Sequence, residues 1–412
     1  MSDDLDPERA EPVAVGPPRH RMNRLERIRA RRTHNRRRLV AALAVVILAA
    51  VVIAAILLGS KLVRSGSGDF AGGGKDDVVI QVHDGDSTTQ IGQTLRDQNV
   101  VSTVKGFVDA SRDNAAIAAI QPGFYKVRTE MSAASAVERL ADPGNRVGKL
   151  VIPEGRQLDD VADVKTDAVT KGIFSLIADA SCVELNGQRK CGVSVDDLRK
   201  AAGQGNPASL QVPEWATKPV TAMGNNHRRI EGLIAPGMWN VNPTGSPQDI
   251  LATLIGSSVK HYEGGGLLDT AKAMNMSPYE ILVVASLIQR EAKPDDFAKV
   301  ARVIYNRLAA PQRLEFDSTV NYPLDRQEVA TTDADRLTPT PWNTYASDGL
   351  PATPICSPGD PALAAAERPE PGDWLYFVTV DLQGTTLFTK DYQQHLANIE
   401  LARRNGVLDS AR

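Results

Sequence analysis

The longest apolar stretch of the chain covers residues 39–58, twenty consecutive positions without a charge. As an α-helix with a rise of about 1.5 Å per residue, this stretch would be about 30 Å long, which matches the hydrocarbon core of a bilayer. We therefore predict a single transmembrane helix over residues 39–59. A cleaved signal peptide is the alternative, although its apolar region is usually only about 7 to 15 residues long.

The charges around this stretch are distributed unevenly. Ten arginines lie among residues 19–38, whereas only Lys61 and Arg64 follow the apolar stretch closely. Because positive charge marks the cytoplasmic end of a membrane helix, we expect residues 1–38 to form an Arg-rich cytoplasmic tail and the rest of the chain to be exported. Contact with anionic lipids or with nucleic acid would be another explanation of the arginines.

The exported part is large and acidic. Residues 60–77, which are rich in Gly, predict a flexible linker. The remaining length is sufficient for two or three domains, and a hydrophobic content of 42% can supply their cores. After Arg64 the chain holds 34 basic and 44 acidic residues. Because this balance disfavours a polyanionic partner, we expect no nucleic acid to bind the protein.

Two segments after the linker share one pattern of apolar and polar positions. In the first, alternating residues are followed by a turn at Gly85 and by helical spacing from Ile91; in the second, a turn at Gly155 precedes helical spacing from Leu158. Both predict strand, turn and helix, either as two related units or by chance similarity. We place the domain boundaries so that they give residues 78–148, 149–217 and 218–412.

The C-terminal part combines helical and strand patterns. Helical spacing dominates residues 247–308, while residues 338–359 are rich in Pro and Thr and have no regular pattern. Residues 374–380 and 385–388 have the pattern of a β-hairpin that turns near Gly384. Short strands and helices in mixed order predict an α+β fold for the exported chain.

One carboxylate falls on the apolar side of a predicted helix. Ser277, Pro278 and Glu280 form the capping box of a helix start. Apolar residues then recur at spacings of three and four through Ile288, and Glu291 continues that stripe. A buried, unpaired carboxyl keeps its proton to higher pH, which is what a general acid needs. The alternative is that Glu291 frays outward and pairs with a Lys or Arg.

The cysteines and histidines give a smaller set of expectations. Cys182 and Cys191 are nine positions apart in a polar segment, and an exported chain can oxidise them to a disulfide, although they can also remain reduced. Cys356 has no basic neighbour in the sequence and is expected to be a bystander. The six histidines are scattered, and the chain has no HExxH, GxSxG or P-loop motif. We expect no metal site and no cofactor.

Several motifs, found in one order along the chain, resemble the YceG-like family of endolytic murein transglycosylases. They are IEGLIAPGMW (230–239), ASLIQREA (285–292), VIYNRL (303–308), LEFDSTVNY (314–322), TPTPWNTYASDGLPATPICSPG (338–359) and LYFV (375–378). The sequence departs from the family pattern in several places: Gln289 and Arg290 replace Glu and Lys, Ser318 replaces Pro, Trp342 replaces Tyr, Ala352 replaces Pro, and Cys356 lies near the rim.

The resemblance implies a LysM-like subdomain ahead of an α+β catalytic domain. It also implies cleavage of the β-1,4 bond between N-acetylmuramic acid and N-acetylglucosamine in nascent peptidoglycan strands, with 1,6-anhydro ends as products, next to glycan-polymerising synthases. By position the catalytic acid is Glu291. Asn343, Thr344 and Tyr345 would line the cleft and Asp317 would orient it, although all four could instead order loops and turns.

Two other functions remain open at this stage. The two small N-terminal units and the tether are compatible with a non-catalytic scaffold that binds peptidoglycan within the wall-synthesis machinery. A hydrolase that uses water would differ from a lytic transglycosylase only in its products, because it leaves reducing ends.

Overall fold

The computed structural model describes residues 68–407 except 113, 116, 118, 119, 164, 165, 325 and 328–330. Every described element belongs to one compact unit, residues 69–412. The predicted tail (1–38), the predicted transmembrane helix (39–59) and the first part of the linker lie outside the described residues. Among the residues that are described, no helix is both long enough and apolar enough to cross a membrane.

The first folded part is a small α+β unit. Strand β1 (Asp77–Val82) pairs antiparallel with β2 (Gly123–Arg128), which pairs with β3 (Arg146–Val147). Its helices are α2 (Thr88–Asp97), α3 (Val104–Ser111) and α4 (Ala133–Ala141), followed by the 3-10 helix η2 (Pro143–Asn145). Buried apolar side chains of these elements form their own core, which includes Ile80, Leu95, Phe107 and Leu140. The strand, turn and helix predicted for this segment are confirmed.

The second predicted unit does not repeat the first. Strand β4 (Lys149–Ile152) is present, but it pairs with the distant β9 (Gly237–Asn240). Where helical spacing was expected from Leu158, the chain turns and forms β5 (Val161–Asp163). The Leu158 side chain is fully buried and its N–H donates to the Glu231 carboxylate (3.1 Å), so this backbone does not enter a helix. The predicted helix is therefore wrong.

Further short elements complete this region. Strand β5 pairs antiparallel with β6 (Val169–Thr170) and parallel with β10 (Arg326–Gln327). Helix α5 (Ile173–Ala180) leads into the hairpin β7 (Cys182–Leu185) and β8 (Gln188–Cys191). Helices α6 (Val195–Gln204), α7 (Glu214–Ala222) and the 3-10 helix η3 (His227–Ile230) follow.

The structure joins Cys182 and Cys191 in a disulfide across the β7–β8 pair, and Cys356 is a buried free thiol. We expect intact-mass analysis of the protein produced in an oxidising compartment, after alkylation under denaturing conditions, to find one reactive thiol. Replacing both bridged cysteines by Ser is expected to lower the free energy of unfolding by about 2 kcal/mol, because the unfolded chain loses its cross-link. Three alkylated thiols in the wild type from that compartment would rule out the disulfide.

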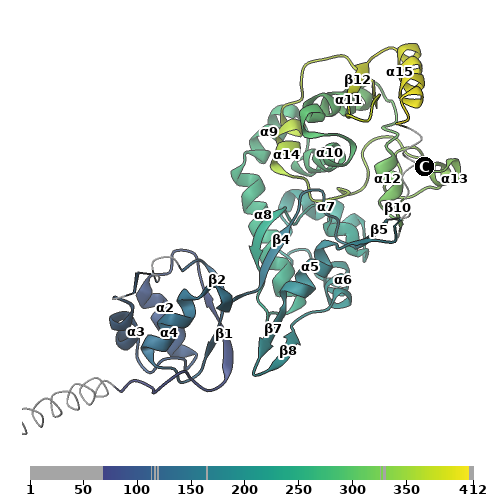
Figure 1. Ribbon diagram of the computed structural model, residues 1–412. Coiled ribbons are helices and arrows are strands. Elements are labelled where there is room, and N and C mark those ends of the chain that lie inside the picture. The colour runs from purple at the N-terminus through teal and green to yellow at the C-terminus, as the bar shows by residue number, and fades with distance from the viewer. Residues whose placement is uncertain are drawn as a thin grey trace, which may run out of the picture. The chain divides into compact units, whose positions relative to one another are not determined.

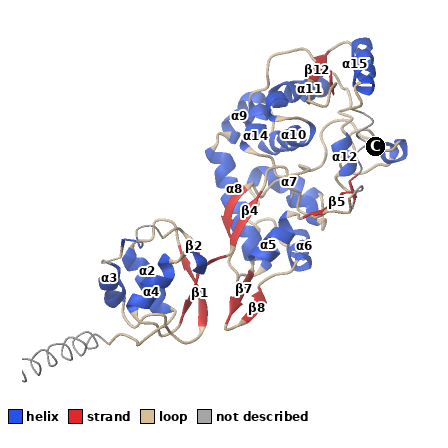
Figure 2. Cartoon of the chain, in the orientation of Figure 1, coloured by secondary structure: helices blue, strands red, loops and turns tan. Residues whose placement is uncertain are grey.

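The C-terminal part is mainly helical, as predicted, and its elements fit the α+β class (Figure 2). The elements in chain order are α8 (Pro247–Gly264), α9 (Leu267–Met274), α10 (Pro278–Glu291), η4 (Pro294–Asp296), α11 (Phe297–Ala309), α12 (Asp317–Asn321), α13 (Asp333–Leu337), α14 (Asp360–Glu367), β11 (Tyr376–Thr379), β12 (Thr386–Thr389) and α15 (Tyr392–Arg404). Strands β11 and β12 form the expected hairpin. The segment 338–359 has little regular structure, also as expected.

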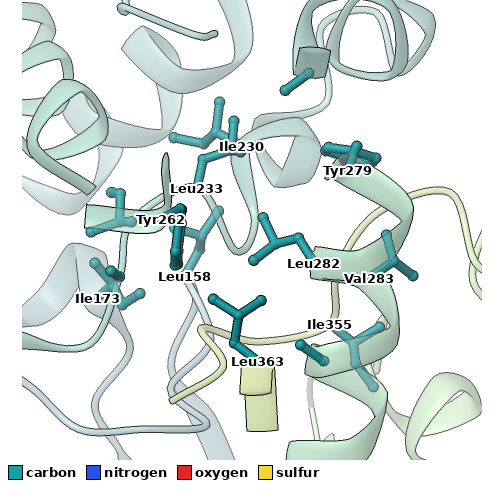
Figure 3. Close-up of a cluster of buried hydrophobic side chains, with 14 of the residues drawn as sticks. Leu158, Ile173, Ile230, Leu233, Tyr262, Tyr279, Leu282, Val283, Ile355 and Leu363 are labelled. Atoms are coloured by element: carbon teal, nitrogen blue, oxygen red, sulfur yellow. The ribbon is translucent and has the colours of Figure 1, made fainter. Parts of the chain in front are cut away.

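Helix α10 is the centre of the main core. It contacts α7, α9, α11, α12 and α14, and Figure 1 places it among α9, α11 and α14. Figure 3 shows Leu282 and Val283 of this helix in a cluster with Ile230 and Ile355. One continuous buried cluster extends from Leu150 to Ala366. Packing therefore does not separate residues 149–217 from residues 218–412, and the boundary between them stays a prediction.

Candidate functional site

Helix α10 fixes the position of Glu291. The helix starts with the predicted capping box, in which the Ser277 N–H donates to Glu280 (2.7 Å) and the Glu280 N–H donates to Ser277 (3.2 Å). Every residue from Ile281 to Ile288 is buried, so this part of the helix is buried on all sides and not only along the predicted stripe. Glu291 is its last residue and is partly buried, because Ala292 leaves the helix with extended backbone. A carboxyl group thus ends a rigid, buried helix.

The surroundings of Glu291 favour its protonated form. Burial is the largest influence and raises the pKa of the carboxyl above its ordinary value, and the negative charge of Asp317 raises it further. The hydroxyl and the backbone N–H of Ser318 lower the pKa, as does the charge of Arg290, but they do not offset burial. The Ser318 hydroxyl has no hydrogen bond of ordinary geometry, so we regard it as a nearby donor rather than a bonded partner. Glu291 can therefore hold a proton at higher pH than an ordinary glutamate.

Asp317 lies at the start of α12 and is fixed by three side chains. Its Oδ1 accepts hydrogen bonds from the Thr331 hydroxyl (2.7 Å) and the Tyr345 hydroxyl (2.8 Å), and Arg336 donates to both carboxylate oxygens (3.3 and 3.2 Å). The Arg336 guanidinium also lies over the Tyr345 ring, 5.0 Å from its centroid. Asp317 therefore brings Tyr345 and Arg336 together next to Glu291, whose charge also acts on Tyr345.

Two of the predicted cleft residues are buried and bonded within the protein. Asn343 is 1% exposed, and its amide donates to the carbonyls of residues 335, 336 and 338 while its oxygen accepts the N–H of Tyr345. Thr344 is 2% exposed, and its hydroxyl accepts the Phe316 N–H (3.0 Å). Both side chains order the loop that carries Tyr345. Their contact with a substrate stays a prediction, as does that of Asp317 and Tyr345.

The sequence reasoning missed a second buried carboxylate, Glu231, which is 1% exposed. Its Oε2 accepts hydrogen bonds from the Tyr322 hydroxyl (2.7 Å) and from the Leu158 N–H (3.1 Å). Burial raises the pKa of Glu231 to about 7. Because Tyr322 directly follows α12, Glu231 holds the far end of the short helix that carries Asp317 and Ser318.

Arg307 was also missed. It is buried on α11, donates to the carbonyls of Leu314 and Leu375, and lies over the Tyr376 ring at 5.5 Å. It thereby ties β11 to the segment that leads into α12. Sequence signals existed for both missed residues: Arg307 continues the apolar spacing of α11, and Glu231 stands inside an otherwise apolar run.

The site can therefore supply one proton-bearing carboxyl with fixed polar side chains next to it. Within the described part of the chain, no group of three or more His, Cys, Asp or Glu side chains is arranged to hold a metal ion. Proton transfer by Glu291 is the chemistry that these residues support directly.

Comparisons with known proteins indicate which proteins this chain is similar to. The chain is 26% identical over 324 residues to a Bacillus subtilis protein named endolytic murein transglycosylase, and the match covers 78% of this chain and 83% of that protein. A Streptococcus pneumoniae protein of the same name is 23% identical, and the match covers 78% of this chain but only 58% of that protein.

A solved structure and a family model point in the same direction. The crystal structure of a yceG-like protein from Listeria monocytogenes has a TM-score of 0.50 and 25% identity, and the match covers 78% of this chain and 98% of that one. The model of the YceG-like family matches residues 80–401, which include every site residue described above. The chain belongs to the YceG-like family.

Proposed function

We propose that this protein is an endolytic lytic transglycosylase that cleaves peptidoglycan strands at the β-1,4 bond between N-acetylmuramic acid and N-acetylglucosamine. The observation that carries the proposal is the carboxyl of Glu291, held at the end of a buried helix with a raised pKa. The names of the Bacillus and Streptococcus relatives support the choice of substrate.

In the proposed reaction, protonated Glu291 donates its proton to the glycosidic oxygen as the bond to the muramic acid C1 breaks. Positive charge develops on the sugar ring, and the carboxylate that has just formed stabilises it. Glu291 then removes the proton from the muramic acid C6 hydroxyl, whose oxygen bonds to C1 and gives a 1,6-anhydro end. The carboxyl regains its proton, so no net proton is consumed.

This reaction needs one catalytic carboxyl because the substrate provides the nucleophile. Ordinary glycosidases use two carboxyl groups on either side of the bond. Asp317 is the nearby second acid, but its carboxylate already accepts hydrogen bonds from Arg336, Thr331 and Tyr345. Its proposed role is electrostatic: its negative charge favours the proton on Glu291 before the reaction and the positive sugar ring during it.

The products test the proposal. Digestion of purified glycan strands by the exported part of the protein should release fragments whose masses show 1,6-anhydro-muramic acid ends and internal cuts. Fragments with reducing ends would identify a hydrolase instead. Strands that are retained but not cut would favour the scaffold function.

The pH dependence of cleavage should respond in opposite directions to two neighbours of Glu291. Cleavage requires protonated Glu291 and falls as the pH rises through its pKa. Asp317→Asn removes a charge that raises this pKa, so the alkaline limb of kcat should move to lower pH. Ser318→Ala removes a donor that lowers the pKa, so the limb should move to higher pH.

The matched control for the charge change is Asp269→Asn, because Asp269 is an exposed carboxylate of α9. Its pH profile should be that of the wild type. If both site variants left the limb in place, or moved it in the same direction, a group other than Glu291 would control the profile.

We further propose that residues 39–59 anchor the protein in the membrane with the Arg-rich tail in the cytoplasm, next to glycan-polymerising synthases. The support is the uncharged stretch 39–58 and the arginines before it. The full chain should sediment with membranes after alkaline extraction and be released by detergent. If alkaline extraction alone released the protein from the membranes, residues 39–59 would not be a membrane anchor.

A further inference from the structure

A cavity adjoins the end of α10. It has a volume of about 250 Å³, and its lining includes Glu154, Arg156, Asp159, Thr170 and Arg290. Arg290 directly precedes Glu291 in the helix. Gly155 also lines the cavity, and a Cβ added to it would lie 3.5 Å from Cγ of Gln289. The cavity is therefore next to the last turn of the helix that carries the proposed catalytic acid.

Arg156 brings an uncompensated positive charge to this cavity. Its backbone is fixed, since its carbonyl accepts the Ser357 N–H (2.8 Å). Its side chain is partly buried, its Nε is fully buried without a hydrogen-bond partner, and it makes no ion pair with any residue that the structure describes. The guanidinium of this cavity-lining residue therefore lacks an anionic partner, and a carboxylate from a ligand in the cavity would match it in charge and shape.

The acidic side chains of the cavity do not neutralise Arg156. Asp159 is already bound to three cationic or neutral partners, His227 (2.7 Å), Arg199 (2.9 Å) and Arg228 (3.0 Å). Glu154 is exposed and lies over Gly359, where an added Cβ would collide with its carboxylate. Glu154 can instead accept an N–H group from a ligand that also carries a carboxylate.

We propose that this cavity binds an acidic residue of the peptide that is attached to muramic acid in peptidoglycan, with its carboxylate on Arg156. The inference rests on the proposed function, because that function places a muramic acid next to Glu291. A peptide residue carries both the N–H and the carboxylate that Glu154 and Arg156 can bind, and the cavity has the size of one residue rather than of a disaccharide. Arg156 is then a residue that selects strands with peptides.

The test compares Arg156→Gln with the wild type on two substrates, peptide-bearing strands and the same strands after an amidase has removed the peptides. We expect KM for peptide-bearing strands to rise about tenfold, with kcat changed less than about twofold. KM for bare strands should not change. Arg156→Lys should restore part of the loss because it keeps the charge. The control is Arg189→Gln, which removes an exposed charge of β8.

A binding experiment separates this inference from the proposed function. The Glu291→Gln protein is titrated calorimetrically with a disaccharide that carries the peptide, with the same compound after amidation of the peptide carboxylates, and with the bare disaccharide. The peptide-bearing disaccharide should bind more tightly than its amidated form. It should also bind more weakly to the Arg156→Gln, Glu291→Gln double variant than to Glu291→Gln. Both results would support peptide binding in the cavity even if the wild type cleaves nothing. Equal binding of all three, or equal effects of Arg156→Gln on both strand substrates, would overturn it.

Discussion

Replacing Glu291 by Gln is expected to reduce the cleavage of glycan strands by about 10³-fold or more, because general acid and base catalysis contribute about 10² to 10⁴-fold and Glu291 is proposed to do both. The amide keeps the size and polarity of the carboxyl but has no proton to give. The measurement is the rate at which 1,6-anhydro ends appear, followed by mass spectrometry.

The same variant should remain folded and should still bind glycan. The raised pKa means that ionised Glu291 is unfavourable in the folded protein, so removing the charge should leave stability equal or higher at alkaline pH. The control is Glu138→Gln, because Glu138 is an exposed carboxylate of α4. This variant should cleave at the wild-type rate. If the Glu291→Gln protein retained most of its activity, Glu291 would not be the catalytic acid.

Replacing Glu231 by Gln is expected to change how stability depends on pH. The pKa of Glu231 is raised from an ordinary 4.5 to about 7. The folded protein therefore binds a proton that the unfolded chain releases between these values, and Glu231 lowers the free energy of unfolding as the pH rises through this window. The loss corresponds to about 3 kcal/mol and is complete above about pH 7. Below the ordinary pKa of 4.5, ionisation of Glu231 does not lower the free energy of unfolding.

Gln at this position accepts the same hydrogen bonds from Tyr322 and Leu158 but does not ionise. The stability of Glu231→Gln relative to the wild type should therefore rise by about 3 kcal/mol between pH 4.5 and pH 8, whatever its offset at low pH. Urea unfolding followed by Trp fluorescence at several pH values measures this difference. A constant difference across the range would show that Glu231 titrates like an ordinary glutamate.

Local sequence signals predicted the frame of the site well. The capping box at Ser277 and the apolar spacing up to Ile288 placed α10 correctly, and the position of Glu291 on that helix followed from periodicity alone. Periodicity did not indicate that the helix is buried on every side, because Leu282 and Val283 lie off the predicted stripe. Burial on all sides depends on neighbours such as α9, α11 and α14, which come from separate parts of the chain.

Other features depend on contacts that are distant in sequence. The segment after Gly155 has the spacing of a helix, but the hydrogen bond from the Leu158 N–H to Glu231, 73 positions away, belongs to a different backbone path. The arrangement of Asp317, Arg336 and Tyr345 likewise joins three segments of a region with little regular pattern. Local pattern identifies the residue types in such a region, whereas tertiary contacts decide which of them meet.

The most direct test of the account is the protonation state of Glu291 itself. Infrared difference spectra of the wild type minus Glu291→Gln isolate the carbonyl band of this one carboxyl and cancel those of the other buried acids, including Glu231. We predict a protonated band that persists well above the ordinary glutamate pKa and that moves to lower pH in Asp317→Asn. A band that disappears at the ordinary glutamate pKa, and whose pH dependence is unchanged in Asp317→Asn, would contradict the account.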